Sequence, residues 1–119
     1  MSTRAELGLH GERIAAAYLT DRGLQVLDRN WRCRDGELDI VAREGGALVF
    51  CEVKTRRAVG FGHPVEAVTP AKRRRLRLLA QRWLEAHSEH ARDLRFDVVG
   101  VLVRGRGPAV VTHLPAAFS

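Results

Sequence analysis

Two strand-like segments, 36–44 (GELDIVARE) and 47–55 (ALVFCEVKT), are separated by only two glycines. The second is largely apolar, as in a buried β-strand, and a Gly-Gly pair between two strands predicts a tight hairpin turn. We therefore expect the two segments to pair antiparallel. Counting outward from the turn places Asp39 opposite Glu52, subject to the register of the turn.

The second of these strands carries charges that burial would disfavour. Glu52 and Lys54 are two residues apart, so both side chains point to the face that also carries Leu48 and Phe50. A carboxylate and an ammonium among apolar side chains are costly unless they are paired or hold an ion. With Asp39 opposite Glu52, two carboxylates and a lysine meet on one face of the hairpin.

A divalent cation would remove the repulsion between these carboxylates. Mg²⁺ takes one or two carboxylates together with water and phosphate oxygens, and Mn²⁺ accepts the same kinds of ligand. Lys54 beside the ion would orient or activate a water, or stabilise negative charge on a phosphoryl group. The simpler alternative is a solvated Glu52–Lys54 pair on an exposed strand, with Glu37 and Asp39 adding solvated charge.

A helix is expected before this hairpin, over residues 4–22, with Ser2 or Thr3 as its cap. Its apolar stripe comprises Leu7, Gly11, Ile14, Ala15 and Tyr18. Glu12 lies beside that stripe and would point into the acidic site if this helix covers that face of the sheet. The alternative for Glu12 is an ordinary solvated helical residue.

The remaining elements complete an α/β pattern. A second helix is expected from Pro70, with Thr69 as its cap, to about His87. Its apolar stripe comprises Leu76, Leu79, Ala80 and Trp83. Further strands are expected over 24–30, 94–103 and 109–114, and a loop over 56–68. The order helix, three strands, helix, two strands in 119 residues predicts a single α/β domain with a mixed sheet flanked by helices.

Positive charge dominates the sequence and favours a polyanionic partner such as nucleic acid. Lys and Arg number 20 against 14 Asp and Glu, which gives a net charge of +6. The run KRRRLR at 72–77 begins the second helix, where cations oppose the helix dipole unless an anion such as phosphate is bound. The candidate nucleic-acid-binding residues are Arg56, Arg57, Lys72, Arg73, Arg74, Arg75 and Arg77. A solvated basic face is the alternative.

Membrane and secreted classes are not favoured. The N-terminus is polar, without the hydrophobic region of a signal peptide, and no apolar run is long enough to span a bilayer. We therefore expect a cytoplasmic protein without a membrane partner. Cys33 and Cys51 form neither a CxxC motif nor a zinc-ligand spacing, so we expect both to be reduced and buried.

Several segments together resemble a known family. GELDIVA followed by VFCEVKTR resembles the PD-(D/E)xK nuclease signature, in which an Asp on one strand precedes E-x-K on the next. Leu38 stands where that motif has Pro. With GERIAAAYL, NWRCRDGELDIVA, FGHPVEAV, a K…RL pair and RFDVV, the chain from about Leu7 to Val99 is similar to the YraN family of small endonuclease-like proteins.

The resemblance implies a restriction-endonuclease-like fold with an αβββαβ core, similar to that of Holliday-junction resolvases. Carried over by position, it implies Asp39 and Glu52 as metal ligands, Lys54 as the catalytic lysine and Glu12 as a further acid on the helix. The implied cofactor is Mg²⁺ or Mn²⁺.

The expected function is therefore metal-dependent hydrolysis of DNA phosphodiester bonds, with a preference for branched DNA of repair or recombination as a further option. A nucleic-acid-binding protein without turnover and an RNA nuclease stay open as alternatives. A homodimer would suit the cleavage of two strands.

Overall fold

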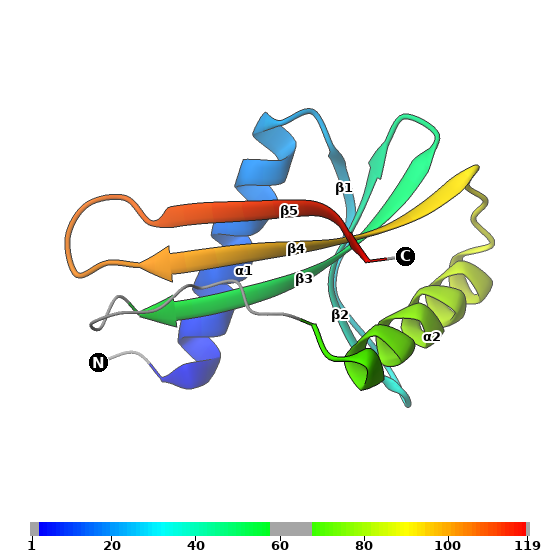
Figure 1. Cartoon of the computed structure of the whole chain (residues 1–119), viewed down its shortest axis with the longest axis horizontal. Coiled ribbons are helices and arrows are strands. Elements are labelled where there is room, and N and C mark those ends of the chain that lie inside the picture. The colour runs from blue at the N-terminus through cyan, green and yellow to red at the C-terminus, as the bar shows by residue number, and fades with distance from the viewer. Residues whose placement is uncertain (1–2, 58–67, 119) are drawn as a thin grey trace.

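Five strands form one mixed sheet in the computed structural model, which describes residues 3–57 and 68–118 (Figure 1). The strand order is β1-β2-β3-β4-β5; β3 and β4 run parallel, and every other neighbouring pair is antiparallel. The elements are α1 (Arg4–Asp21), β1 (Gln25–Cys33), β2 (Gly36–Glu44), β3 (Ala47–Arg57), α2 (Pro70–His87), β4 (Asp93–Val103) and β5 (Val110–Phe118). The predicted α/β fold and its order of elements are confirmed.

β1 and β5 extend well beyond their predicted ends. β1 continues to Cys33 because its pairing with β2 runs to the turn, where Cys33 lies opposite Gly36. β5 continues to Phe118, which pairs with Phe96 beyond a shift in register. Of the loop predicted at 56–68, the first two residues belong to β3, and residues 58–67 lie outside the described part of the chain.

The alternating residues of β3 separate two hydrophobic cores. Leu48 and Phe50 pack in the core that includes the apolar residues of α2, whereas Val49 and Cys51 pack in the core that includes those of α1. The two helices therefore cover opposite faces of the sheet (Figure 1). α2 is also the crossover connection that the parallel pairing of β3 with β4 requires.

α1 approaches the sheet through small residues, so its buried stripe differs from the predicted one. The buried residues are Gly11, Glu12, Ala15, Ala16 and Leu19. Leu7, Ile14 and Tyr18 of the predicted stripe are only half-buried. A Cβ atom on Gly11 would lie 1.8 Å from Thr55 Oγ1, so the backbone of the helix lies directly against β3. Gly11 and Ala15 are therefore buried as predicted, whereas the larger Leu7, Ile14 and Tyr18 lie at the edge of the contact with the sheet.

The predicted stripe of α2 is confirmed, since Leu76, Leu79, Ala80 and Trp83 are all buried. Both helices begin at threonine caps: Thr3 Oγ1 accepts from the Glu6 amide at 3.1 Å, and Thr69 Oγ1 accepts from the Lys72 amide at 3.2 Å. Ser88 ends α2 in the left-handed conformation, with φ of 50°.

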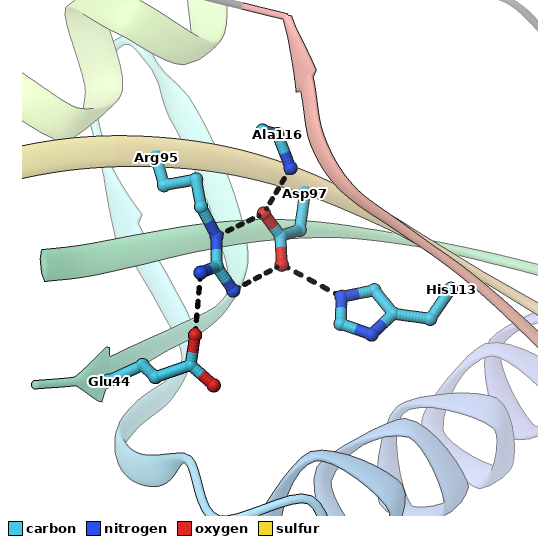
Figure 2. A network of polar contacts seen from close by, with 5 residues as sticks. All are labelled: Glu44, Arg95, Asp97, His113 and Ala116. Atoms are coloured by element: carbon cyan, nitrogen blue, oxygen red, sulfur yellow. Dashed lines mark hydrogen bonds and ion pairs between the residues drawn. The ribbon is translucent and has the colours of Figure 1, made fainter.

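A buried charge network connects β5 to β4 (Figure 2). Asp97 is 0% exposed and accepts from Arg95 Nε at 2.9 Å and Nη2 at 3.0 Å. His113 Nε2 lies 2.7 Å from Asp97 Oδ2, and the Ala116 amide donates to Oδ1 at 2.9 Å. Arg95 also donates to Glu44 at 2.6 Å. The network fixes β5 where its register shifts, so the burial of Asp97 has a structural explanation.

The cysteines differ in environment. Both are free thiols, but only Cys51 is buried, and Cys33 is half-buried. The prediction that both are buried is therefore wrong for Cys33, because the β1–β2 turn leaves it near the surface. Burial raises the pKa of the Cys51 thiol far above its ordinary value. Among the helices of the described residues, none is long and apolar enough to cross a membrane.

Candidate metal centre

Asp39 lies where β2 separates from β3. The ladder between these strands ends with Ile40 opposite Cys51, so the predicted register, with position 39 toward position 52, is followed. Beyond that pair, Asp39 Oδ2 accepts a hydrogen bond from the Val53 amide at 2.8 Å. The Asp39 carboxylate therefore accepts a backbone hydrogen bond that a carbonyl of a paired strand would otherwise accept. This bond holds the carboxylate against β3.

The alternation of β2 breaks at the same point. Leu38 packs in the core beside α2 and Ile40 in the core beside α1, although residues two apart in a regular strand share a face. On the neighbouring strand β1, Arg29 pairs with Ile40 and Trp31 with Leu38. The residue between them, Asn30, has φ of 53°, in the left-handed region. This local irregularity turns the acidic side chains of β2 toward α1.

Three carboxylates meet there: Glu12 of α1, and Glu37 and Asp39 of β2. One oxygen from each lies within 4.8 Å of the others, a spacing that could hold a metal ion. We call these three residues the acidic group. The helix reaches the strand at this place because Gly11, next to Glu12, lets the backbone of α1 approach β3 closely.

One carboxylate oxygen of Glu12 has no partner among the residues that the structure describes. The residue is only 8% exposed, and its Oε2 has no hydrogen-bond partner within residues 3–57 and 68–118. Burial raises the pKa of Glu12; side-chain hydrogen bonds with Asn30 and Asp39 oppose that shift, and the charge of Glu37 adds to it. A buried, unpaired carboxylate oxygen costs free energy, so this position fits a ligand that contributes positive charge.

Burial raises the pKa of Asp39 from its ordinary value of 3.8 to about 8, and the neighbouring charge of Glu52 contributes next. The hydrogen bond from the Val53 amide acts in the opposite direction, and the charges of Glu12 and Glu37 raise the pKa further. Without a cation, Asp39 would hold a proton over much of the neutral range. A divalent ion would take the place of that proton.

Glu52 lies near the acidic group but points to another partner. Its charge raises the pKa of Asp39, while its Oε1 lies 2.5 Å from Lys72 Nζ of α2. The Glu52 side chain is 12% exposed, so the reading of Glu52 as half of a solvated surface pair with Lys54 is wrong. Lys54 is half-buried and lies opposite Gly100 of β4, two residues beyond Glu52.

Two residues of the predicted basic run of α2 have partners within the protein and are only partly exposed. Lys72 pairs with Glu52, and Arg73 donates to the Val68 carbonyl at 3.0 Å while lying over the Phe118 ring. The exposed members of the predicted set are Arg56 and Arg57 at the end of β3, and Arg74, Arg75 and Arg77 on α2. Fewer of the predicted basic residues are exposed than the sequence of 72–77 alone indicates.

Glu37 is the member of the acidic group that the sequence reasoning did not select as a site residue. The available signal was its spacing, because it lies two residues before Asp39 on the same strand. All three ligand atoms are carboxylate oxygens. Oxygen donors of this kind suit hard cations such as Mg²⁺, Mn²⁺ or Ca²⁺ and not the softer ions that prefer sulfur or imidazole. The residues present therefore fit the cation expected from the sequence.

Comparison with known proteins gives one consistent result. Residues 11–101 match the profile of the uncharacterised protein family UPF0102. A UPF0102 protein of Beutenbergia cavernae is 56% identical over 114 residues, which cover 96% of this chain and 97% of that protein. A UPF0102 protein of Rhodococcus opacus is 52% identical over 119 residues, covering 99% of this chain and 100% of the relative. A UPF0102 protein of Streptomyces griseus is 55% identical, covering 95% and 96%.

Proposed function

The chain belongs to the uncharacterised protein family UPF0102, and because that description states no activity, we propose a function from the site itself. We propose a metal-dependent nuclease that hydrolyses phosphodiester bonds in DNA. The observation that carries the proposal is the acidic group, in which the buried Oε2 of Glu12 has no protein partner among the described residues. Glu52 and Lys54 on the adjacent strand add the acid and the ammonium of an E-x-K motif.

The resemblance to the PD-(D/E)xK nucleases and the YraN family supports the same function. The order of α1, β1, β2, β3, α2 and β4 corresponds to the αβββαβ core expected of restriction-endonuclease-like proteins. Asp39 precedes Glu52 and Lys54 on neighbouring strands of that core, in the order the signature requires. This similarity of pattern supports nuclease chemistry by analogy. The role of each residue is argued from the position of its side chain.

Each residue has a defined part in the proposed site. Glu12, Glu37 and Asp39 would hold Mg²⁺ or Mn²⁺, and Glu52 would serve as a fourth carboxylate once Lys72 releases it. When bound, the cation would lower the pKa of a water and neutralise charge on the phosphate. The Val53 amide orients Asp39 through its 2.8 Å hydrogen bond.

Lys54 would act on the reacting groups from β3. Lys54 is a half-buried residue, and its ammonium would hold the attacking water through a hydrogen bond or stabilise the charge that develops on the phosphoryl oxygens. Exposed arginines at the end of β3 and on α2 would contact the DNA backbone without reading its sequence. A preference for branched DNA and a homodimer that cuts both strands stay predictions.

The proposal is tested by incubating labelled branched and linear DNA with the purified chain in Mg²⁺ or Mn²⁺. We expect cleavage that EDTA abolishes and that Asp39→Asn and Lys54→Ala each reduce by at least about 100-fold, the size of a general acid–base contribution. Asp21→Asn, an exposed acid at the end of α1, is the matched control and should cut normally. A wild-type protein that cuts no DNA, or variants that cut as well as it does, would show that the proposal is wrong.

One observation favours a second candidate, a DNA-binding protein without turnover. The short ion pair between Lys72 and Glu52 neutralises an acid that catalysis needs. In such a protein the pair would be permanent, and the arginines of α2 would still bind phosphates. Salt-dependent DNA binding without Mn²⁺ uptake in calorimetry would favour this candidate, whereas cleavage of RNA in place of DNA would favour an RNA nuclease.

A further inference from the structure

A small basic pocket adjoins the acidic group at the β1–β2 turn. It has a volume of about 310 Å³ and is lined by Arg32, Cys33, Arg34, Gly36 and Glu37. We call it the hairpin pocket. Glu37 belongs both to this pocket and to the acidic group, so the two sites share a carboxylate. None of the proposed roles above uses the two arginines of this turn.

The hairpin pocket is held in place by α2. Asp35, in the turn itself, accepts from Arg82 Nε of α2 at 3.0 Å. Gly36 has φ of 142°, and a Cβ atom there would lie 3.4 Å from Leu79 and 3.8 Å from the Arg75 side chain. Figure 1 shows the same turn beside α2. The backbone of the turn is therefore held against α2, and the exposed Arg75 of α2 lies next to it.

Arg32 and a bound cation would compete for Glu37. Arg32 Nε lies 3.2 Å from Glu37 Oε2, and the Arg32 side chain is 77% exposed. Exposed ion pairs contribute little to stability, so this pair can open at small cost. A divalent ion held by Glu37 would repel the guanidinium and weaken the pair. Arg32 would then present its planar set of N–H donors next to the ion, a geometry that suits phosphate oxygens.

We propose that the hairpin pocket is a phosphate subsite for the nucleic-acid backbone, in which Arg32 pairs with Glu37 before the cation binds and with a backbone phosphate afterwards. Arg34, exposed on the same turn, supplies the second cation of the subsite. The identity of the phosphate as part of DNA rests on the proposed function. The consequence is a positive coupling: the cation strengthens DNA binding, and DNA strengthens cation binding by the same factor.

The first test uses the cation alone. Mn²⁺ affinity is measured by calorimetry on the full chain and on Arg32→Gln, Arg34→Gln and Arg106→Gln. The last of these removes the same charge from the β4–β5 connection, at the opposite end of the molecule from the hairpin (Figure 1). We expect Arg32→Gln to bind Mn²⁺ about two- to fivefold more tightly, because the competing ion pair is lost. The other two variants should bind it as the wild type does.

The second test uses a fluorescein-labelled duplex with a phosphorothioate backbone, which resists hydrolysis, in a titration followed by anisotropy. In Mn²⁺ we expect Arg32→Gln and Arg34→Gln each to weaken binding about three- to tenfold and to lower the salt slope by about one. Arg106→Gln should change binding less than twofold. Mn²⁺ should strengthen DNA binding by the wild type more than by Arg32→Gln. Because Arg32 is exposed, folding of the variants is checked by thermal unfolding.

The outcomes separate the subsite from the nuclease activity. Unchanged Mn²⁺ affinity in Arg32→Gln, or hairpin variants that bind DNA like Arg106→Gln, would overturn the subsite even if the wild type cuts DNA. If Mn²⁺ affinity and DNA affinity both change in the variants as expected but the wild type cuts no DNA, the subsite is upheld and the nuclease activity is refuted. A wild type that binds neither Mn²⁺ nor DNA would refute both.

Discussion

Two buried carboxylates, Asp97 and Glu12, illustrate opposite solutions to the same physical problem. Asp97 lies within hydrogen-bonding distance of Arg95, His113 and the Ala116 amide (Figure 2). Glu12 has an oxygen without any such partner in the described part of the chain. The first carboxylate is satisfied by its own fold, and the second fits an external cation. This difference, more than burial itself, singles out the acidic group as a candidate site.

The raised pKa of Asp39 predicts how the metal-free protein responds to pH. Because the folded value of about 8 exceeds the ordinary 3.8, folding favours the protonated form. The stability that the protonated Asp39 contributes is fully present below about pH 4 and is lost as the pH rises through about 8. Unfolding followed in EDTA should show this loss in the wild type relative to Asp39→Asn, which cannot titrate. Equal pH profiles for the two proteins would contradict the prediction.

The proton on Asp39 also determines how metal binding depends on pH. A cation held by Asp39 must displace its proton, so Mn²⁺ affinity should rise by up to about tenfold per pH unit and level off above about pH 8. Calorimetry at several pH values, in buffers of different ionisation enthalpy, measures both the affinity and the proton released. An affinity that does not change between pH 6 and pH 8 would be the contrary result.

The sequence predicts part of the site because part of it depends on local geometry. The two-glycine turn determines the β2–β3 register, so Asp39 and Glu52 could be assigned to neighbouring positions. The role of Glu37 depends on the break in alternation beside Asn30, whose left-handed conformation no pattern in the strand reveals. Likewise, the ion pair of Glu52 with Lys72 depends on where α2 docks.

At the scale of elements, the contact between α1 and β3 positions Glu12. A Cβ atom on Gly11 would lie 1.8 Å from Thr55 Oγ1 and 2.7 Å from its Cβ, so Gly11→Ala should push the helix away from the strand. We expect a loss of about 1–3 kcal/mol in the free energy of unfolding and weaker Mn²⁺ binding, measured by denaturant titration and calorimetry.

Gly8→Ala is the matched control on the same helix, because a Cβ atom there meets nothing within 4 Å. It should be neutral or stabilise the protein by up to about 1 kcal/mol, as expected for Ala in place of Gly within a helix. If Gly11→Ala is as stable as Gly8→Ala, the close approach of α1 to β3 is not as described.

The network that attaches β5 to β4 should contribute to stability without affecting the acidic group. Asp97→Asn replaces an acceptor with a donor against Arg95, so it should cost about 2–4 kcal/mol in the free energy of unfolding. Asp93→Asn, at an exposed position of the same strand, should cost less than about 0.5 kcal/mol. Mn²⁺ affinity of folded Asp97→Asn should equal that of the wild type; a large loss would instead place Asp97 in the metal site.

Helix packing marks another limit of prediction from sequence. The stripe of α2 was predictable because large apolar residues recur at helical spacing and all of them are buried. α1 buries mostly small residues and a glutamate, so hydrophobicity predicted only part of its buried face: Gly11 and Ala15 are buried as predicted, but Glu12 and Ala16 were not predicted to be. A helix that contacts a sheet through Gly and Ala is positioned by steric fit, which a hydrophobic pattern does not express.

At the scale of the whole molecule, exposed arginines are spread over several elements. Acids meet between α1 and the sheet, while exposed arginines lie on both helices, at the end of β3, on the β1–β2 turn and on the β4–β5 connection. The net charge of +6 predicts a polyanionic partner, but only the fold shows that Lys72 pairs with Glu52 and that Arg73 donates to the Val68 carbonyl. A DNA backbone held by the arginines of the β1–β2 turn would bring phosphates next to Glu37 and so next to the acids, as the proposed activity requires.

The central claim is that Glu12, Glu37 and Asp39 hold a divalent cation. The most direct measurement is the anomalous scattering of crystals grown or soaked in Mn²⁺. The account predicts a single strong peak bounded by the carboxylates of these three residues, and no peak at that place in Asp39→Asn. A wild-type crystal without that peak, or with Mn²⁺ bound only at other acids, would contradict it.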